Sequence, residues 1–568
     1  MFTTDQVIEE QLPHLKNNRL LHKPVRSLLS YLLNEKECQK FAELYPHIEG
    51  IDFVEQVLDY FDFSYAVVDK EKQRIPVTGK LVIIANHPIG SLDGLALLKF
   101  VSEIRPDVKA IANDLLTTIK PLEKILLPVN NMSGNTRKEN LNNIFQYLNN
   151  DGAVIIFPAG EVSRLKPNGV KDGKWHSGFY RMAKATKAPI LPIYVDGRNS
   201  AMFYSASMIY KPLATMLLMR EMFKQKQKSV NLRIGEGIPY ENYANDNLPL
   251  KTKIKLFHKH LYRIGSQKSG VFKTQSAIAL PEPRQNLKKS IEKCQHLGST
   301  NDGKDIYIYN YHESSPILRE IGRLREIAFR AVGEGSGKKR DIDKYDAYYH
   351  HLILWDKEEL EIIGAYRFAD TEKVMAEQGK SALYTQTLFK YEKEMQPYLM
   401  RGLELGRSFV QPKYWGKRSL DYLWFGIGAF LKVNPQFKYL FGPVSISQSY
   451  PKAARDLMVY FYKLYFGNQS KMAESNQPYQ YYQADINLLK QSFSGDNYKE
   501  DFTQLKHLLA NMGVSVPTLY KQYSELCHPG GVQFLAFGID PDFNDCLDGL
   551  VLVDITKFTD KKKARYLA

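Results

Sequence analysis

The sequence contains few cysteines, and none is placed as a metal ligand or a disulfide partner would be. Cys38, Cys294, Cys527 and Cys546 are scattered over 568 residues without a Cys-x-x-Cys pair. Zinc sites and disulfide frameworks need cysteines at close, regular spacing. We therefore expect free thiols in a reducing compartment and no metal site.

Long uncharged apolar runs are also missing. A membrane-spanning helix needs about 18 such residues or more, and the best stretch, residues 208–223, is interrupted by Lys211 and Arg220. The start of the chain, "MFTTDQVIEEQLPHL", is acidic and has no apolar core, which argues against a secretory signal. These absences predict a cytoplasmic protein.

Acidic residues are too few to balance the basic ones. The 77 Lys and Arg residues exceed the 62 Asp and Glu residues, which gives a net charge of +15. Such a surface attracts nucleic acid, anionic lipid or an acidic protein. Zinc fingers, RNP-like strands and basic recognition helices are all absent from the sequence, so we expect no nucleic-acid partner.

What the sequence does contain is the pattern of two α/β domains, as its length suggests. Residues 1–65 have the spacing of an amphipathic helical segment. Over residues 66–265, short apolar runs such as "KLVIIANH" and "GAVIIFPAG" alternate with helical stretches. Residues 266–300 collect Pro, Ser and Lys and predict a linker. A second α/β pattern fills residues 301–568.

In the first domain, a histidine and an aspartate follow a buried strand. The stretch "LVIIANHPIGSLDGLALLKF" (residues 81–100) runs from strand to helix through His87, Gly90 and Asp93. A histidine that titrates near pH 7 accepts a proton from an attacking alcohol, and a carboxylate fixes its tautomer. Functional residues are expected where strands end in such sheets. The alternative is a capping loop in which Asp93 is only a first-turn acid.

Three downstream blocks extend this pattern, namely "AVIIFPAGEVSR" (153–164), "KWHSGFYRMA" (174–183) and "APILPIYV" (188–195). With the block around His87 they resemble, in order and spacing, the glycerolipid acyltransferases and their haemolysin-like relatives. The resemblance implies that His87 is the general base toward an acceptor hydroxyl and that Asp93 orients it. It also implies an acyl thioester donor, and an acceptor site shaped by Gly160 and Glu161.

These blocks depart from the family pattern in three places. Five residues separate His87 from Asp93 where the family has four, and Gly90 is expected to absorb the extra residue. The family's Phe-Pro-Glu-Gly order becomes Phe-Pro-Ala-Gly-Glu at residues 157–161. Residues 126–140, where the family supplies an arginine for a glycerol phosphate, offer only Arg137 as a substrate-binding candidate. We therefore expect an acceptor that carries no phosphate.

The second domain resembles the acetyltransferase-like (GNAT) fold: one helix, consecutive antiparallel strands, then a strand, a turn and a helix. In that fold a strand presents backbone N–H groups to the thioester, and the next helix start holds donor phosphates. The matching turn lies in "VQPKYWGKRSLDY". We predict that Lys413, Gly416, Lys417 and Arg418 bind the phosphopantetheine arm of acyl carrier protein. The alternative is a solvated basic turn.

Six ionisable residues of this domain, Arg325, Asp343, Asp346, Arg367, Glu404 and Arg407, resemble those of acyl-homoserine-lactone synthases and ornithine lipid N-acyltransferases. The resemblance implies acylation of an amino acid's α-amine. We predict Glu404 as the base and Arg367 and Arg407 as the carboxylate-binding residues. Asp343 and Asp346 are candidates for the ammonium of ornithine. Glu404 and Arg407 face opposite sides of a strand unless a bulge intervenes; an internal salt-bridge network is the alternative.

Joined in one chain, the two domains resemble the bifunctional ornithine lipid synthases. The second domain is expected to N-acylate ornithine with a 3-hydroxyacyl group, and the first to O-acylate the resulting lyso-lipid. The resemblance implies acyl-acyl carrier protein as co-substrate and no bound cofactor. Residues 207–228, apolar beside a basic cluster, predict binding to the inner face of a bacterial cytoplasmic membrane, with a core helix as the alternative.

Three alternatives stay open at this point. The first is the same chemistry with glycine or another amino acid as the head group. The second is that the second domain makes a diffusible acylated signal, and the third is a non-catalytic lipid-binding protein of the membrane surface.

Overall fold

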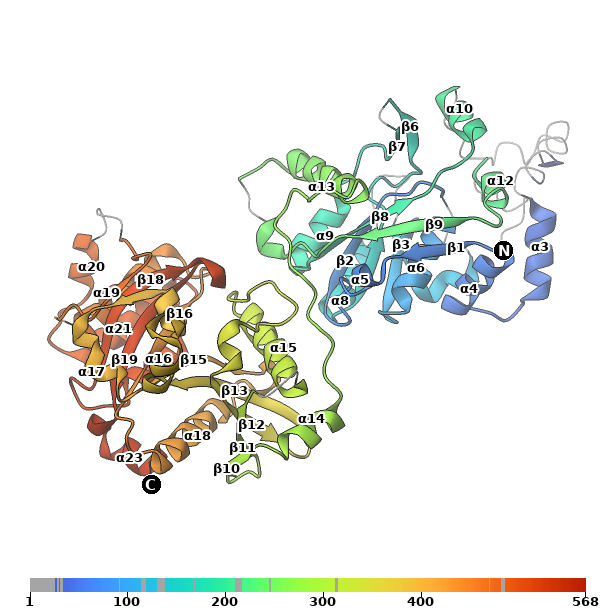
Figure 1. Ribbon diagram of the computed structural model, residues 1–568. Coiled ribbons are helices and arrows are strands. Elements are labelled where there is room, and N and C mark those ends of the chain that lie inside the picture. The colour runs from blue at the N-terminus through green and yellow to red at the C-terminus, as the bar shows by residue number, and fades with distance from the viewer. Residues whose placement is uncertain are drawn as a thin grey trace. The chain divides into compact units, whose positions relative to one another are not determined.

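The structure is a computed structural model that describes residues 26–27, 30, 34–90, 92–113, 119–129, 138–167, 169–209, 217–244, 247–311, 315–468, 470–481 and 486–567. Its internal contacts divide the chain into two units, Met1–Ala277 and Ile278–Ala568 (Figure 1). The division falls within the stretch 266–300 that the composition marks as a linker.

Unit 1 is built on a seven-stranded sheet with the order β1-β9-β8-β2-β5-β3-β4. The strands are β1 (Ser64–Val67), β2 (Leu81–Ala85), β3 (Val108–Asn113), β4 (Leu126–Val129), β5 (Ala153–Ile156), β8 (Ile190–Asp196) and β9 (Ser229–Ile234). Strand β2 is parallel to both of its neighbours, β5 and β8. The carboxyl ends of these three strands therefore lie at one edge of the sheet, as expected for the residues that follow them.

Helices cover both faces of this sheet. They are α3 (Glu35–Leu44), α4 (Gly50–Tyr60), α5 (Asp69–Lys72), α6 (Leu92–Ser102), α8 (Lys138–Asn149), α9 (Gly178–Thr186), α10 (Ala201–Ile209), α12 (Leu218–Phe223) and α13 (Leu250–Gly265). Ile83 packs with Leu97 of α6 on one face, whereas Ile84 packs with Phe179 of α9 and Phe257 of α13 on the other. Burial on both faces explains why β2 is apolar at every position.

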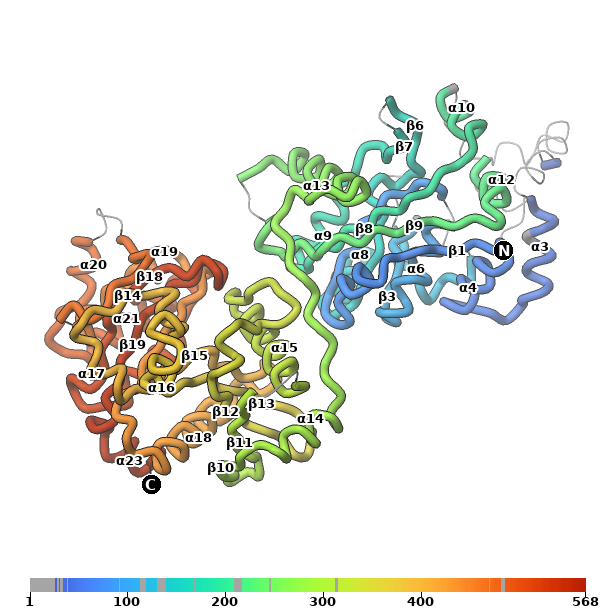
Figure 2. The backbone as a smooth tube through the Cα atoms, in the orientation of Figure 1, coloured from blue at the N-terminus to red at the C-terminus, as the bar shows by residue number. Residues whose placement is uncertain are grey.

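A small hairpin stands apart from the main sheet of unit 1. It consists of β6 (Arg164–Lys166) and β7 (Gly169–Lys171), which pair antiparallel. Helix α10 contacts β6, and both project from the same end of the unit in Figure 2. The hairpin begins at Arg164, the last residue of the block 153–164.

Unit 2 contains an eight-stranded sheet with the order β10-β11-β12-β13-β15-β16-β19-β18. The strands are β10 (Gln295–Ser299), β11 (Asp305–Asn310), β12 (His350–Asp356), β13 (Glu361–Asp370), β15 (Gly402–Val410), β16 (Tyr439–Ile446), β18 (Val532–Asp540) and β19 (Cys546–Asp554). Only β15 and β16 pair in parallel, and their register joins just Gly402–Glu404 to Tyr439–Phe441. Beyond those residues no pairing joins the two strands.

The helices of unit 2 pack on both faces of its sheet. They are α14 (Arg284–Ile291), α15 (Pro316–Ala331), α16 (Thr371–Gln378), α17 (Gln396–Leu399), α18 (Ser419–Val433), α19 (Lys452–Phe466), α20 (Ile486–Ser492), α21 (Tyr498–Asn511), α22 (Thr518–Ser524) and α23 (Asp560–Tyr566). Helix α15 packs on one face through Ile321 and Leu324, and α18 on the other through Leu423. A further pair of short strands joins β14 (Phe389–Tyr391) to β17 (Ala473–Ser475).

The α/β class predicted for both domains is confirmed, and each strand predicted in the two patterns is present. The predicted linker is only partly extended chain. Residues 284–299 contain α14 and β10, and Leu287 and Ile291 of α14 are buried in the core of unit 2. Among the described helices, none combines the length and the hydropathy needed to cross a membrane.

The close approach of β16 to β15 gives a test of this fold. A Cβ atom added to Gly442 would lie 1.9 Å from the carbonyl oxygen of Leu405, whereas one added to Gly406 meets nothing within 4 Å. We expect Gly442→Ala to destabilise unit 2 by about 1–3 kcal/mol, because the backbone itself must move. Gly406→Ala is the matched control and should change the thermal midpoint by no more than about 2 °C. Equal midpoints for both variants would contradict this packing.

Candidate active sites

The first candidate site lies on the loop of residues 86–93, which we call the His87 loop and which joins β2 to α6. Asn86 is buried, and both polar atoms of its side-chain amide bond to the backbone of Val195 on β8 at 2.8 Å. Gly90 has a φ of 123°, a conformation that side chains rarely allow. These contacts and this turn fix the path along which the loop leaves the sheet.

Asp93 is the anchor of the His87 loop. Its side chain is fully buried in the first turn of α6, and it accepts backbone N–H groups from Ile89 at 2.9 Å, Gly90 at 3.0 Å and Gly94 at 2.9 Å. One carboxylate oxygen lies 3.2 Å from Nδ1 of His87. The ring N–H is poorly aligned for a hydrogen bond, so the contact is best described as an ion pair. The five-residue spacing therefore still brings the two side chains together.

The surroundings of His87 favour a charged imidazole. Burial by itself would lower the pKa of His87, but the carboxylates of Asp93 and, further away, Asp172 outweigh it and raise that pKa above its usual value. The ring stacks on Phe157 with centroids 4.2 Å apart, and 18% of the side chain is exposed. A ring that is reachable and whose protonated form is stabilised can accept a proton from a bound hydroxyl.

Asp172 is a site residue that the sequence patterns did not reveal. It is fully buried and accepts hydrogen bonds from the His87 N–H at 3.3 Å, Ser163 Oγ at 2.5 Å and Trp175 Nε1 at 2.9 Å. Its own N–H donates to the hydroxyl of Tyr262 at 2.7 Å. One carboxylate thus holds the His87 loop against two blocks that are distant in sequence. No motif marks it, because its role depends on contacts made only in the folded chain.

The block after β5 borders the His87 loop. The N–H of Ser163 donates to the carbonyl of His87 at 2.7 Å. Gly160 has a φ of 64°, and Glu161 is partly exposed, 4.0 Å from Nη2 of Arg164. Gly160 donates its N–H to the carbonyl of Phe157, the residue whose ring stacks on His87. The acceptor-site role of Gly160 and Glu161 stays a prediction, and Arg137 lies outside the described residues.

The second candidate site is created by a bulge in β15. Ala365 of β13 pairs with Phe409 while Arg367 pairs with Gly406, so β15 has one extra residue in this interval. Arg407 lies within it and has a φ of 50°. Strained backbone of this kind costs about 1–3 kcal/mol and is common at functional sites. The bulge breaks the strand alternation between Glu404 and Arg407, and both side chains contact Tyr384 or its neighbour Thr385.

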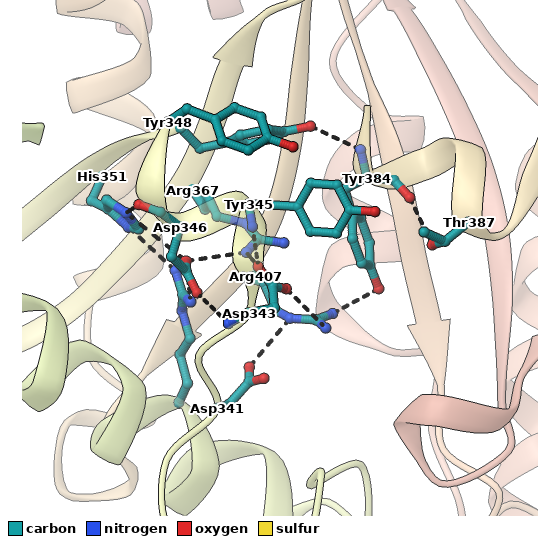
Figure 3. Close-up of polar contacts among 12 residues, drawn as sticks. Asp341, Asp343, Tyr345, Asp346, Tyr348, His351, Arg367, Tyr384, Thr387 and Arg407 are labelled. Atoms are coloured by element: carbon teal, nitrogen blue, oxygen red, sulfur yellow. Dashed lines mark hydrogen bonds and ion pairs between the residues drawn. The ribbon is translucent and has the colours of Figure 1, made fainter. Parts of the chain in front are cut away.

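Ion pairs connect the aspartates and arginines around this bulge (Figure 3). Asp346 lies 2.8 Å from Nη1 of Arg325 and 3.1 Å from Nη1 of Arg367. Asp343 lies 2.5 Å from Arg367 and 3.8 Å from Arg407. Burial would raise the pKa of Asp346, but the two arginines hold it well below its usual value. The structure therefore brings the predicted residues together, with both aspartates already paired to cations.

Glu404 lies beside this network without an ion pair among the described residues. Its side chain is 1% exposed, and it accepts hydrogen bonds from the hydroxyl of Tyr349 and from the N–H of Thr385 at 2.6 Å. Burial raises the pKa of Glu404 despite these two donors. Tyr349 also accepts the N–H of Tyr384 at 2.9 Å. A carboxyl with a raised pKa is suited to accept a proton near neutral pH.

Among the described residues, two buried donors of Arg367 lack a hydrogen-bond partner, against one, Nε, of Arg407. The guanidinium of Arg367 lies 5.2–5.7 Å from the ring centroids of Tyr345, Tyr349 and Tyr384, which we call the tyrosine cage. It is 1% exposed, and its Nε and Nη2 have no hydrogen-bond partner within the part of the chain that is described. Arg407 instead donates to the Tyr384 hydroxyl at 2.9 Å and pairs with Asp341 at 3.2 Å.

Three further carboxyl groups, those of Glu334, Asp540 and Asp548, form no ion pair among the described residues, and we call them the unpaired carboxyls. Burial raises the pKa of Asp548 to about 7 and, with a contribution from Asp548, that of Glu334 to about 8, although Glu334 keeps some surface exposure. Burial also raises the pKa of Asp540, which accepts from the Tyr384 hydroxyl at 3.4 Å. Tyr384 thus connects Asp540 to the tyrosine cage.

The predicted donor-binding turn lines a cavity of about 430 Å³ at the start of α18. Gly416 forms the turn with a φ of 76°. Lys413, Lys417 and Arg418 line the cavity together with Lys304 and the acidic side chains of Asp302, Asp356, Glu358 and Glu359. Lys413 pairs with Glu361 outside that lining. The basic residues therefore share a cavity, but acidic residues offset part of their charge.

Comparison with known proteins places both units among acyltransferases. A family model described as "Acyltransferase" matches residues 7–267, and one described as "Acetyltransferase (GNAT) domain" matches residues 324–425. The chain is therefore an acyltransferase, and the predicted order of an O-acyltransferase-like domain followed by a GNAT-like domain is confirmed. The predicted enzyme class is confirmed with it.

Individual relatives define the family more closely. A glycine N(alpha)-acyltransferase of Phocaeicola vulgatus is 33% identical over 303 residues, which is 51% of this chain and 92% of that protein. A lyso-glycine lipid O-acyltransferase of the same organism is 28% identical over 241 residues, 41% of this chain and 85% of that protein. An L-ornithine N(alpha)-acyltransferase of Brucella abortus is 31% identical over 151 residues, 23% of this chain and 51% of that protein. The chain belongs to the family of the glycine N(alpha)-acyltransferases.

The raised pKa of Asp548 predicts a pH-dependent stability. Folded Asp548 keeps its proton to about pH 7, whereas an unfolded aspartate loses it near pH 4, so unit 2 should lose stability as the pH rises between these values. We expect Asp548→Asn to remove up to about 4 kcal/mol of this pH dependence in urea unfolding measured from pH 4 to 8. The exposed Asp542→Asn is the control. An unchanged pH slope in Asp548→Asn would contradict the assignment.

Proposed function

We propose that this acyltransferase makes a two-chain aminolipid in two steps. Unit 2 N-acylates an amino acid with a 3-hydroxyacyl group, and unit 1 then O-acylates the hydroxyl of that group. The observation that carries the proposal is that each unit holds its own proton acceptor, His87 in one and Glu404 in the other, with its pKa shifted upward. The relatives named for glycine N-acylation and for lyso-glycine lipid O-acylation support this pair of steps.

In unit 2 we assign the substrate carboxylate to Arg367. Its free Nε and Nη2 form the edge of a guanidinium that binds a carboxylate through two parallel hydrogen bonds. An α-amine must lose a proton to attack, and the hydroxyl of Tyr349 passes that proton to Glu404. The amine nitrogen then bonds to the thioester carbon, the C–S bond breaks, and the departing thiolate takes the proton that the new amide nitrogen loses.

The bulge in β15 supplies the stabilisation that this step needs. Arg407 and Ser408 have no register partner on β13 or on β16. Backbone N–H groups released from a ladder in this way can point at the oxyanion that forms on the thioester carbonyl. The register of β15 with β16 ends at Glu404, and the donor arm would enter beyond the close contact of Leu405 with Gly442.

In unit 1, His87 removes the proton from the acceptor hydroxyl as its oxygen attacks a second thioester. The imidazolium that forms is stabilised by Asp93, and it returns the proton to the departing thiolate. The new bond is the ester C–O, and the bond that breaks is the thioester C–S. Asp172 contributes by holding the His87 loop and by its charge.

We propose acyl carrier protein as the donor, with the phosphodiester of its phosphopantetheine arm at the start of α18. Lys413, Lys417 and Arg418 around the cavity there would contact the acidic carrier. In the same way, a membrane surface would supply the amphiphilic intermediate to unit 1. Leu165, Met202 and Met208 are exposed apolar side chains on the β6–β7 hairpin and α10, whereas the segment 207–228 lies partly outside the described residues.

Two head groups fit this chemistry. Ornithine needs a partner for its side-chain ammonium, and Asp343 and Asp346 are already paired with arginines. The ammonium would therefore face the unpaired carboxyls beyond Tyr384, and it would have to stabilise the charged form that burial disfavours. Glycine needs no such partner. Glycine is the head group that the comparison favours, because the glycine N(alpha)-acyltransferase is matched over 92% of its own length. The L-ornithine N(alpha)-acyltransferase is matched over 51% of its own length.

Lipid analysis of variants tests the order of the two steps. We expect His87→Ala to accumulate the mono-acylated lipid, and Glu404→Gln to abolish both products, each through a loss of about 10²–10⁴ in rate. His47→Ala, an exposed histidine of unit 1, is the control. Mass spectrometry of total lipids from a host without aminolipids measures all three. Two-chain lipid in His87→Ala cells would refute the role of unit 1.

A competition assay tests the carboxylate site and the head group together. We expect the purified chain to prefer glycine or ornithine over the corresponding amide, and Arg367→Gln to lose about tenfold or more of that preference. The ratio is measured within each variant, so partial loss of folded protein does not change it. Isotope-labelled glycine and ornithine supplied together identify the head group. A preference retained in Arg367→Gln would refute this assignment of Arg367.

A further inference from the structure

The structure assigns a second carboxylate-binding residue, Arg164, to the acceptor site of unit 1. Ser163, the residue before it, donates its N–H to the carbonyl of His87 at 2.7 Å and points its hydroxyl at Asp172. Arg164 itself lies over the ring of Phe203 on α10, 5.2 Å from the ring centroid. Adjacent Cα atoms are about 3.8 Å apart, so the backbone of Arg164 lies one residue away from the contact between Ser163 and His87.

The guanidinium of Arg164 lacks the partners that a buried charge requires. Its side chain is 13% exposed, and its Nε and Nη1 are buried without a hydrogen-bond partner among the described residues. The one carboxylate that approaches it, that of Glu161, is 4.0 Å from Nη2, beyond hydrogen-bond distance. Phe203 offers a π face but no acceptor for an N–H group. Buried N–H donors that stay unpaired are costly and rare, so this site is built to receive an anion.

The proposed function says which anion this is, and the inference rests on it. After N-acylation the α-nitrogen is an uncharged amide, and the α-carboxylate is the anion that the lyso-lipid still carries. The attacking hydroxyl and this carboxylate are separated by about two residue lengths, roughly 7 Å in an extended chain. Arg164 is one residue from the backbone contact with His87, which suits that span.

The surroundings of Arg164 suit an amphiphile as well as an anion. Val162, Phe203 and Tyr204 form a small apolar cluster with Leu217 beside it. Leu165 on β6 and Met202, the residue before Phe203 on α10, are exposed apolar side chains. A lyso-lipid would thus place its carboxylate on Arg164 and its hydroxyl at His87 while its alkyl chain follows the apolar side. We infer that Arg164 selects an acylated amino acid over a neutral alcohol as the acceptor.

Comparison of an acid with its ester tests this inference. The full chain is given an acyl thioester and either the N-(3-hydroxyacyl) amino acid or its methyl ester. We expect wild type to prefer the acid by at least about tenfold in kcat/KM. Arg164→Gln should raise KM for the acid by about tenfold and leave kcat/KM for the ester unchanged. The KM of Arg164→Lys for the acid should lie between those of wild type and Arg164→Gln. Arg181→Gln, an exposed arginine on α9, is the control.

The outcomes separate this inference from the proposed function. Acylation of both acceptors, with the preference for the acid retained in Arg164→Gln, would overturn the role of Arg164 alone. If wild type acylates neither acceptor, the O-acylation step itself is refuted, and the inference with it. An Arg164→Gln protein that acylates the ester at the wild-type rate is folded, so loss of preference in that protein reports on the carboxylate contact.

Discussion

The removal of a carboxyl group from water is the constraint on which both sites depend, and it has opposite results in the two units. Asp93 is fully buried but accepts three backbone N–H groups and faces His87, so its pKa is lowered and it stays charged. Glu404 is almost as buried but has only Tyr349 and Thr385 as donors, and its pKa rises. The number and charge of the donors, and not burial alone, decide which carboxyl stays charged and which one has a raised pKa.

In unit 2 the bulge in β15 decides which buried charged groups meet. Without the bulge at Arg407, the strand alternation would send Arg407 and Glu404 to opposite faces of the sheet. The bulge brings the guanidinium of Arg407 to the Tyr384 hydroxyl, to which it donates a hydrogen bond, and into an ion pair with Asp341. That leaves Arg367 with free donors beside Glu404. The strained backbone at Arg407 on β15 therefore lies in the same network as the free guanidinium donors of Arg367 on β13.

The sequence predicts the parts of this molecule that depend on local patterns. Apolar runs and helical spacing predict the strands and helices, and the His87 block predicts the contact with Asp93. Asp172, Tyr349 and Tyr384 were not predicted, because each acts through residues that only the fold brings near, such as His87 and Glu404. A single sequence also cannot show that Asp343 and Asp346 are already paired, which changes the ammonium site expected from them.

The two proposed carboxylate contacts, at Arg367 and at Arg164, are consistent with N-acylation before O-acylation. Arg367 is enclosed by the tyrosine cage at 1% exposure, which suits a small amino acid that enters before any chain is attached. Arg164 is more exposed and borders apolar residues that continue to the surface, which suits the same carboxylate once it carries an alkyl chain. The product of the first step keeps the anion and loses the amine charge. If Arg164 binds that carboxylate as proposed, the acceptor site would favour the product of unit 2 over the free amino acid.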